Sequence, residues 1–410
     1  MRAPGDSRRA FLESMGLVGA GVILAGPTES ARGFPANDAI TVGCIGTGGR
    51  CRGLMKSLSG LPGVRIVAVA DAWDAALAEG RKLADPKAFA TKHYREILDR
   101  KDVDAVLIAS PDHWHVPMTV DACAAGKDVY VEKPLTHGPS EGARVIRAQD
   151  DGKRVVQVGQ QQRSMPHIVK ARELIRSGRI GKVFKVALSW NQNTGDRFAR
   201  GPQTVDPNQV AWRDFLGSAP DQPFDAYRFR NWRWFWDFGG GLLTDLMVHW
   251  IDVAQWILGL DRPEKATAFG EPFAGEGVWQ TPDTIQCLLS YPGKVQAHFE
   301  GTFSNARNAS RIEFLGTEGS IWIDRGGYVL YPERGRGESE SMILGTDPRR
   351  GLDFYDKPDG EALHLADWLG AIRSRNKPAC PAEAGVAAAD AAHLANRAFR
   401  EDRVARWIPA

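Results

Sequence analysis

The chain has 410 residues, of which 43% are hydrophobic and 25% are charged, a composition that excludes collagen-like, disordered and membrane-spanning classes. This length suits two or three domains, since domains average about 100 to 200 residues. The formal net charge is only +2, without the Lys and Arg excess typical of nucleic-acid-binding proteins, so no nucleic-acid partner is expected.

Residues 1–36 are predicted to be an export signal. Arg8 and Arg9 precede Phe11 and an apolar run over 15–26, a pattern typical of twin-arginine signals. The run of about 12 residues is shorter than the roughly 20 that a membrane-spanning helix needs. An amphipathic or disordered N-terminus with a chance arginine pair is the alternative. On the signal interpretation, the twin-arginine export machinery is a partner and the mature protein is periplasmic or otherwise exported.

A glycine-rich turn follows the first predicted strand. The β-branched run over 40–45 leads into this turn, and a helix is predicted over 54–59. In such a turn, backbone N–H groups at a helix N-terminus hold a pyrophosphate. The candidate cofactor ligands in the turn are Gly46, Thr47, Gly48, Gly49 and Arg50.

The second predicted strand, 64–70, ends at Asp71. A carboxylate at this distance from the turn accepts hydrogen bonds from an adenosine ribose. It also repels a 2′-phosphate, and no basic residue follows within 72–74, so NAD is favoured over NADP. The third glycine of the usual fingerprint is replaced by Cys51. An ordinary strand-to-helix turn is therefore the alternative.

Strands and helices alternate up to residue 158. Repeated units of this length predict a parallel, doubly wound sheet, and ligands bind such sheets beyond the carboxyl ends of the strands. The predicted helices are 73–83, 117–125 and 140–151, and the predicted strands are 103–109, 128–131 and 155–158. Strand-end residues that we expect to contact the cofactor are Ser110, Pro111, His113, Trp114, His115, Glu132 and Lys133, with Gln161 after the last strand.

Four motifs occur in order along the chain: the turn over 46–49, Ser110-Pro111 with His115, Glu132-Lys133-Pro134, and Asp245-x-x-x-His249. This series resembles the Gfo/Idh/MocA oxidoreductases, from which Cys51 and the Ser at 110 depart. The resemblance implies an NAD(P)-dependent enzyme with a Rossmann domain over 37–158. It also implies a domain over 159–410 that binds substrate, forms homo-oligomers through its sheet, and packs its C-terminal helices on the Rossmann domain.

Lys133 follows an apolar strand and precedes Pro134, so a cis peptide bond is plausible there. A lone lysine is usually a solvated surface charge. In the matching family motif, however, a strand-end lysine beside a dinucleotide can donate to a substrate hydroxyl and stabilise the developing alkoxide. We therefore predict a catalytic role for Lys133.

A helix is predicted around 243–258, where Asp245, His249 and Asp252 are spaced four and three residues apart and share one face. The remaining positions are mostly apolar, so the helix is expected to be buried. We predict that His249 is the general base, with an ordinary pKa of about 6.5. Asp245 is expected to orient a substrate hydroxyl or the imidazole. A core histidine with satisfied hydrogen bonds is the alternative, and Asp252 is expected to be structural.

The second half of the chain predicts an α+β domain with a mostly antiparallel open sheet. Together with the first half, this defines an α/β protein with an N-terminal doubly wound parallel sheet. The predicted strands are 183–191, 284–290, 296–302, 311–315 and 320–324, and the predicted helices are 167–177, 364–374 and 384–400.

Tryptophan is unusually frequent, with thirteen Trp against seven Tyr. A Trp ring can stack on the apolar face of a sugar, and interleaved arginines can bind its hydroxyls. The alternative is packing in the core or at a subunit interface, and Trp232, Trp234 and Trp236 have the spacing of one strand face. Candidate substrate contacts are Arg163, Trp190, Trp232 and Trp236, with Asp245 and His249.

A metal site is the weaker interpretation of Asp112, His113 and His115. These residues lie close together in the sequence, but no complete ligand set of defined spacing accompanies them. His113 and His115 are instead expected on a loop around the nicotinamide and ribose. No metal is therefore predicted.

The sequence thus predicts an exported oxidoreductase that transfers hydride between NAD and a secondary hydroxyl of a sugar, sugar derivative or cyclic polyol. Because no NAD pool exists outside the cytoplasm, the cofactor is expected to be tightly bound. One alternative is an NAD-dependent glycosidase or lyase acting by transient oxidation and elimination. Another is a non-catalytic sugar- or nucleotide-binding protein on the same fold. The near-zero charge favours a neutral sugar over an anionic polymer.

Overall fold

The computed structural model describes residues 39–193, 204–334, 337–343 and 360–407. The predicted export signal over 1–36 lies outside the described residues. Within the described ranges, no helix combines the length and the apolar character needed to cross a membrane.

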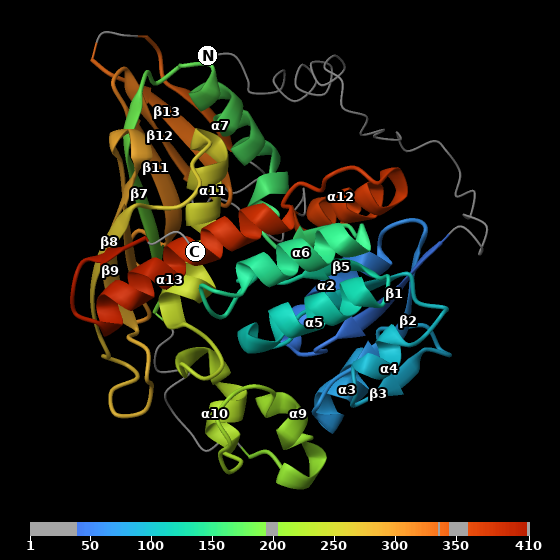
Figure 1. The fold of residues 1–410 in the computed structure, drawn as a ribbon. Helices are drawn as coiled ribbons and strands as arrows, with labels where there is room; N and C mark the ends of the chain where they lie inside the picture. The colour runs from blue at the N-terminus through green and yellow to red at the C-terminus, as the bar shows by residue number, and fades with distance from the viewer. Residues whose placement is uncertain (1–38, 194–203, 335–336, 344–359, 408–410) are drawn as a thin grey trace, which may run out of the picture. The chain divides into compact units, whose positions relative to one another are not determined.

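The first domain is built on a six-stranded, all-parallel sheet in the order β3-β2-β1-β4-β5-β6 (Figure 1). Strands β4 and β5 are buried at every position, as expected for a parallel sheet covered by helices on both faces. The predicted Rossmann sheet is confirmed. Its strands are β1 (Ile40–Ile45), β2 (Val64–Ala70), β3 (Phe89–Thr91), β4 (Ala105–Ile108), β5 (Asp128–Val131) and β6 (Val156–Val158).

The helices of this domain follow the predicted alternation, but two begin earlier than predicted. Helix α2 (Gly49–Ser59) starts directly after Gly48, and α5 (Asp112–Ala124) starts five residues before Pro117. Proline favours the first turn of a helix, which placed the predicted start at Pro117. Packing of the apolar α5 face against the sheet compensates for the one backbone hydrogen bond that Pro117 cannot make. The others are α3 (Asp74–Arg81), α4 (Arg95–Leu98) and α6 (Gly142–Gly152).

The second domain contains a nine-stranded sheet in the order β14-β13-β12-β11-β7-β10-β9-β8-β15. Only β7 and β10 pair in parallel, so the predicted mostly antiparallel sheet is confirmed. The five predicted strands are β7 (Val183–Asn191), β9 (Thr284–Tyr291), β10 (Val295–Thr302), β11 (Ser310–Gly316) and β12 (Gly319–Asp324). Four further strands are β8 (Lys265–Glu271), β13 (Gly327–Pro332), β14 (Glu340–Ile343) and β15 (Ala405–Arg406).

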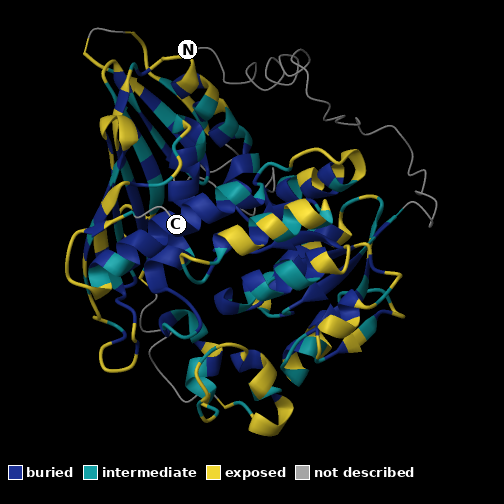
Figure 2. Cartoon of the chain, in the orientation of Figure 1, coloured by how far each residue is buried: buried dark blue, intermediate teal, exposed yellow. Residues whose placement is uncertain are grey.

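Helices cover one face of this sheet and connect it to the first domain (Figure 1). The helix predicted around 243–258 begins with the π-helical turn η4 (Leu243–Met247) and continues as α11 (Val248–Leu258). Figure 2 shows α11 and α13 buried along most of their length. The remaining long helices are α7 (Pro166–Arg176), α12 (Gly360–Ser374) and α13 (Ala382–Arg400), and short 3-10 turns are η1 (Gln161–Ser164) and η5 (Pro292–Lys294).

The two C-terminal helices pack on the first domain, as the family resemblance implied. Leu365 and Trp368 of α12 belong to the hydrophobic cluster of β1 and α2. The start of α13 lies in another cluster of the first domain, and its later residues lie in the core of the second. At Gly385 of α13, an added Cβ would lie 2.6 Å from Val158, so a glycine permits the close helix-to-strand contact.

An irregular stretch of the second domain, residues 207–238, reaches the first domain and is here called the bridging segment. It contains η2 (Pro207–Gln209), α9 (Trp212–Leu216), α10 (Ala226–Arg230) and η3 (Trp232–Trp234). Trp232 and Trp234 therefore lie in a 3-10 turn, and the interpretation of residues 232, 234 and 236 as one strand face is wrong. Asp225 caps α10 by accepting hydrogen bonds from the next turn, which favours helical geometry over a strand.

Candidate active site

The glycine-rich turn between β1 and α2 has open space on its outer side. Gly46 has φ +79°, and an added Cβ there would lie 2.6 Å from the backbone nitrogen of Ser110. Added Cβ atoms at Gly48 and Gly49 would meet nothing within 4 Å. The first N–H groups of α2 are therefore accessible to an anionic group. Thr47 is buried instead, and its hydroxyl donates to the Ala76 carbonyl at 2.9 Å.

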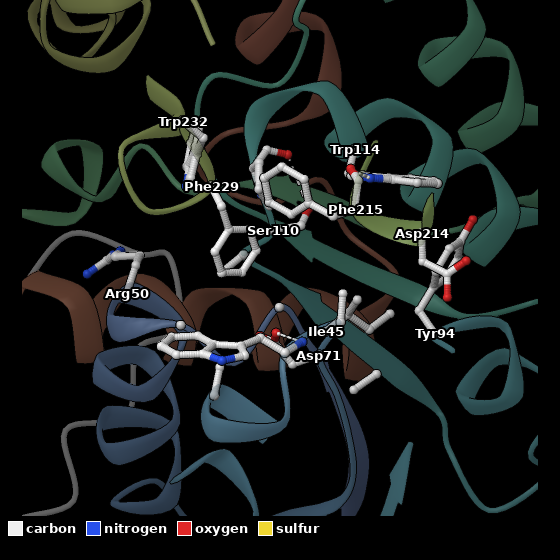
Figure 3. A pocket seen from close by; sticks show the side chains of 18 of the residues that line it. Ile45, Arg50, Asp71, Tyr94, Ser110, Trp114, Asp214, Phe215, Phe229 and Trp232 are labelled. Atoms are coloured by element: carbon white, nitrogen blue, oxygen red, sulfur yellow. Dashed lines mark hydrogen bonds between the residues drawn. The ribbon is translucent and has the colours of Figure 1, made fainter. Parts of the chain in front are cut away.

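A cavity of about 430 Å³ lies beside this turn (Figure 3). It occupies the point between β1 and β4 where the strand order reverses, the usual ligand position in such sheets. Its volume is within the roughly 300 to 1,000 Å³ of ligand sites. Eight of the predicted cofactor contacts line it: Gly46, Gly48, Gly49, Arg50, Asp71, Ser110, Pro111 and Trp114.

The opposite wall of the cavity comes from the bridging segment. Figure 3 shows Phe229 and Trp232 on the side facing Asp71. Ala211 donates its backbone N–H to the Ala72 carbonyl at 2.8 Å, which joins the bridging segment to the loop after β2. Sequence reasoning missed Phe215 and Phe229 because they lie in an irregular segment without periodic signal.

Asp71 lies at the end of β2 and lines the cavity. Its carboxylate accepts a hydrogen bond from the backbone N–H of Trp73 at 2.9 Å. Burial raises the pKa of Asp71 to about 6, although this hydrogen bond opposes the shift. At neutral pH the group is therefore mainly ionised and can accept ribose hydroxyls.

Arg50, Glu132 and Gln161 form a hydrogen-bonded group behind the turn. The Arg50 guanidinium donates to Glu132 at 2.9 Å and also pairs with Glu361 of α12. Gln161 donates its side-chain N–H to Glu132 at 2.8 Å. Despite burial, Arg50 and Lys133 hold the pKa of Glu132 below its usual value. Glu132 and Gln161 thus position Arg50, which alone of the three lines the cavity.

His113, Trp114 and His115 lie in the first turn of α5, not on the expected loop. Nitrogen atoms of the His113 and Trp114 rings each lie 2.8 Å from the main-chain oxygen of Phe215. The His115 ring lies between the Pro134 and Ser110 carbonyl oxygens, at 2.6 and 3.0 Å. Burial lowers the pKa of His113 to about 4. Both histidine rings thus contact the main chain of neighbouring segments. Of these three residues, Trp114 is the one that lines the cavity.

Lys133 connects the two domains. The Lys133–Pro134 peptide bond is cis. The Lys133 Nζ donates to Asp245 Oδ1 and to the Asp245 main-chain oxygen, both at 2.7 Å. The Lys133 side chain is only 12% exposed, so it is not a solvated surface charge.

Asp245 lies in the π-helical turn η4 and is ionised. Besides Lys133, the Arg233 Nε lies 3.5 Å from its Oδ1 atom. Although burial opposes ionisation, these two cations hold the pKa of Asp245 below its usual value. The π turn is consistent with a functional site, because such turns concentrate at functional sites.

His249 lies one helical turn after Asp245 and stacks on Trp190, with ring centroids 5.2 Å apart and planes inclined by 25°. Its Nδ1 atom is buried and has no hydrogen-bond partner among the described residues. Burial lowers the pKa of His249 well below 6.5, and the charges of Lys133 and Arg325 lower it further. The expectation of an ordinary pKa is therefore corrected. His249 is neutral at pH 7 and able to accept a proton.

Arg163 and Asp252 form a buried ion pair with two hydrogen bonds, of 2.8 and 2.7 Å. Arg163 also donates to the Ala379 carbonyl at 3.1 Å. Asp252 is thus structural, but its partner is Arg163 and not the helix backbone. Each of the three guanidinium nitrogens of Arg163 donates a hydrogen bond within the protein, and Arg163 lines neither cavity. A substrate contact at Arg163 stays a prediction that these contacts do not support.

Most of the tryptophans lie in the hydrophobic core or pack against it. Trp234 stacks on Trp279 with ring centroids 4.7 Å apart, and Trp190 is buried against His249. Trp236 donates to the Gln280 carbonyl at 3.0 Å and lines neither cavity. Of the three Trp candidates for substrate contact, Trp232 lines the large cavity.

A second cavity of about 170 Å³ lies on the second-domain side. It shares Arg230 and Arg233 with the large cavity, so the two spaces adjoin. Its other lining residues are Gln192, Asn231, Trp234, Asp245, Leu246 and Phe303.

The five cysteines, all in the described part, are buried and free. The described ranges contain no group of three or more His, Cys, Asp or Glu side chains placed to hold a metal ion.

The parallel sheet, its glycine turn and the cavity at the strand-order reversal define a dinucleotide-binding protein with a second domain. Residues 40–160 match the family model described as "Oxidoreductase family, NAD-binding Rossmann fold", and residues 168–322 match "GFO/IDH/MocA C-terminal domain". The chain belongs to the Gfo/Idh/MocA oxidoreductase family. Its cofactor is NAD, which the open glycine turn and Asp71 fit.

The chain is 27% identical to inositol 2-dehydrogenase of Rhizobium meliloti (strain 1021) over 289 residues, which cover 69% of this chain and 74% of the relative. It is 36% identical to glycosyl hydrolase family 109 protein 2 of Shewanella sp. (strain ANA-3) over 155 residues, 32% of this chain and 34% of that protein. Its fold is similar to that of a levoglucosan dehydrogenase in complex with NADH, with a TM-score of 0.72, 19% identity and coverage of 91% and 100% of the two chains.

Proposed function

We propose that the protein is an exported NAD-dependent oxidoreductase acting on a secondary hydroxyl of a sugar, sugar derivative or cyclic polyol. The observation that carries this proposal is the ion pair of Lys133 with Asp245, beside a neutral His249. Asp245 lines the small cavity that adjoins the cofactor cavity. The similarity to an inositol dehydrogenase supports this substrate class. The enzyme belongs to the NAD(P)-dependent oxidoreductases of CH–OH groups.

Each residue of the site has a role that follows from its contacts. When bound, NAD supplies the hydride acceptor. Lys133 has three donors, of which two are directed to Asp245, and the third is left for the reacting oxygen. This ammonium group stabilises alkoxide character on that oxygen. His249 takes the hydroxyl proton during oxidation and returns it during reduction.

We propose further that NAD is tightly bound and that turnover is redox-neutral, because an exported enzyme meets no NAD pool. The twin-arginine export machinery carries folded proteins, so cofactor bound in the cytoplasm could remain in place. The contacts of the bridging segment with Ala72, His113 and Trp114 support retention. These contacts join the two walls of the cavity.

The first experiment is mass spectrometry of the purified protein after denaturation, which should find nicotinamide nucleotide. The bound NAD is then challenged with a panel of sugars and polyols, and its reduction is followed by near-ultraviolet absorbance. His249→Asn should abolish reduction while retaining NAD, whereas the exposed Lys101→Met control should react like the wild type. A protein that contains no NAD and cannot be reconstituted with it would contradict the proposal.

A second candidate is glycoside cleavage by transient oxidation, favoured by the 36% identity to a glycosyl hydrolase family 109 protein. Oxidation at a sugar carbon acidifies the neighbouring C–H, so loss of that proton expels the glycosidic oxygen. Water would then add across the double bond, its oxygen to the carbon that lost the glycosidic oxygen and its proton to the neighbouring carbon. The nicotinamide cofactor, when bound, would supply the hydride that restores the hydroxyl. Product formed in D₂O should carry deuterium beside the oxidised carbon. Product without deuterium at that carbon would exclude the elimination mechanism and favour simple dehydrogenation.

We also propose a homo-oligomer formed through the outer face of the nine-stranded sheet. Helices cover the other face, whereas Phe269 on β8 and Leu288 on β9 are 71% and 56% exposed. Single apolar residues on a surface are common, but two on adjacent strands favour an interface. Light scattering of the wild type should report an oligomer, and Leu288→Lys should shift it toward the monomer. A monomeric wild type would exclude this interface.

A further inference from the structure

The small cavity beside Asp245 contains more positive than negative charge. All the residues that line it come from the second domain, on the substrate side of the cofactor cavity. Its charged lining residues are Arg230, Arg233 and Asp245. The lining of the small cavity thus includes two arginines and one aspartate.

That carboxylate is already neutralised by a closer partner. Lys133 Nζ lies 2.7 Å from Asp245 Oδ1, whereas Arg233 Nε lies 3.5 Å from the same atom. Asp112 also lies near Arg233. Burial raises the pKa of Asp112 well above its usual value, which reduces its negative charge. Arg233 thus has capacity for another anion.

Arg230 is an exposed residue and has no carboxylate within ion-pair distance in the described part of the chain. Its guanidinium carbon lies 4.8 Å from the ring centroid of Trp73, and that of Arg233 lies 4.2 Å from the ring centroid of Trp232. These stacking contacts hold both planar groups in place. Less rotamer freedom is then lost when they bind a ligand.

We propose that the substrate is an acidic sugar whose carboxylate is bound by Arg230 and Arg233. This inference rests on the proposed function and specifies its substrate class. Planar guanidinium groups match the geometry of a carboxylate and form two parallel hydrogen bonds with it. The reacting hydroxyl then lies toward Asp245 and Lys133, which border the same small cavity or contact its lining. The near-neutral charge of the whole chain does not oppose this, because recognition depends on the local charges.

The experiment uses the purified protein with its bound NAD and sets of three matched sugars. Each set contains a uronate, its uronamide and the parent aldose, for the gluco, galacto and manno configurations. Reduction of bound NAD gives an apparent second-order rate constant for each sugar. We expect one uronate to exceed its uronamide by roughly 10-fold to 100-fold, the range of a charge-assisted hydrogen bond. This preference should decrease with added salt.

Arg230→Gln should remove most of the preference for the uronate, measured as the ratio of the rate constants for the uronate and its uronamide. Arg230→Lys should retain part of it, since the charge remains but the planar group is lost. The control is Arg213→Gln, at an exposed arginine paired with Asp221. Arg233→Gln should also reduce the preference for the uronate. Because Arg233 lies beside Asp245, this variant should in addition change the reaction through its effect on Asp245.

Three results would overturn the inference. Equal or faster reaction of the neutral sugars would reject an acidic substrate and leave the proposed oxidoreductase function standing. A loss of bound NAD in Arg230→Gln, measured by mass spectrometry, would assign this arginine to the cofactor pyrophosphate. Failure of every sugar and polyol to reduce bound NAD would instead reject the proposed function itself.

Discussion

Lys133 Nζ lies 2.7 Å from both Asp245 Oδ1 and the Asp245 main-chain oxygen, although the two residues are 112 positions apart in the chain. One stands at the carboxyl end of β5 in the first domain, and the other lies in the π-helical turn of the second. The candidate active site therefore forms only when the two domains pack together. Its geometry depends on the helices that join them.

Replacing Lys133 by Met should lower turnover by roughly 100-fold to 1,000-fold, the usual effect of losing a donor to a developing oxyanion. The NAD content should stay at the wild-type level, because Lys133 does not line the cofactor cavity. Single-turnover reduction of the bound cofactor measures the rate, with Lys101→Met as the control. Unchanged turnover in Lys133→Met would exclude its catalytic role.

The pH dependence of sugar oxidation should reflect the lowered pKa of His249. The neutral, proton-accepting form of His249 persists to pH values well below 6.5. The rate of sugar oxidation should therefore begin to fall only at those lower pH values. Arg325→Gln removes a cation that opposes imidazolium formation. It should raise the pKa of His249 and move the acidic limb of the pH profile upward. Arg213→Gln serves as the control and should leave the acidic limb at its wild-type position. If Arg325→Gln also left the limb there, this account would be contradicted.

Asp71 should determine the preference for NAD over NADP. Its pKa is raised to about 6, so lowering the pH through this value protonates the carboxyl and weakens its repulsion of a 2′-phosphate. The preference for NAD should therefore fall below about pH 6, and Asp71→Asn should weaken it by roughly 10-fold at neutral pH. The protein is reconstituted with an equimolar mixture of NAD and NADP, and mass spectrometry measures the ratio of the two bound cofactors. An unchanged ratio in Asp71→Asn would place the selectivity elsewhere.

The Arg163–Asp252 pair should stabilise the fold without affecting substrate choice. Arg163→Met leaves the buried Asp252 charge without its partner, which should lower the free energy of unfolding by about 3–5 kcal/mol. The double variant Arg163→Met with Asp252→Leu should recover part of this loss. Urea unfolding measures both, and the sugar panel tests selectivity. Altered selectivity at wild-type stability would restore Arg163 as a substrate contact.

The contact between α13 and β6 should tolerate no added side-chain volume at Gly385. A Cβ there would lie 2.6 Å from Val158, so Gly385→Ala should destabilise the protein by about 1–3 kcal/mol. Gly370 is the matched control in α12, where an added Cβ meets nothing within 4 Å. Gly370→Ala should stabilise the helix by up to about 1 kcal/mol. Equal effects of the two changes in thermal unfolding would argue against close packing at Gly385.

The sequence by itself determined the features that depend on local spacing. Alternating strands and helices predicted the parallel sheet, the turn over 46–49 predicted the cofactor cavity, and alternating polarity predicted five strands of the second sheet. These signals are readable because backbone hydrogen bonding and one-sided burial impose fixed periods on neighbouring residues. The helix start at Pro117 was wrong because distant packing outweighed a local preference.

Only the tertiary structure decided which side chains meet. The pairing of Lys133 with Asp245, the pairing of Arg163 with Asp252, and the second cavity wall formed by the bridging segment all join residues far apart in the chain. The low pKa of His249 likewise arises from burial and from cations on other elements. Charge, desolvation and contact act through space, and the local sequence pattern does not record which distant residues come near.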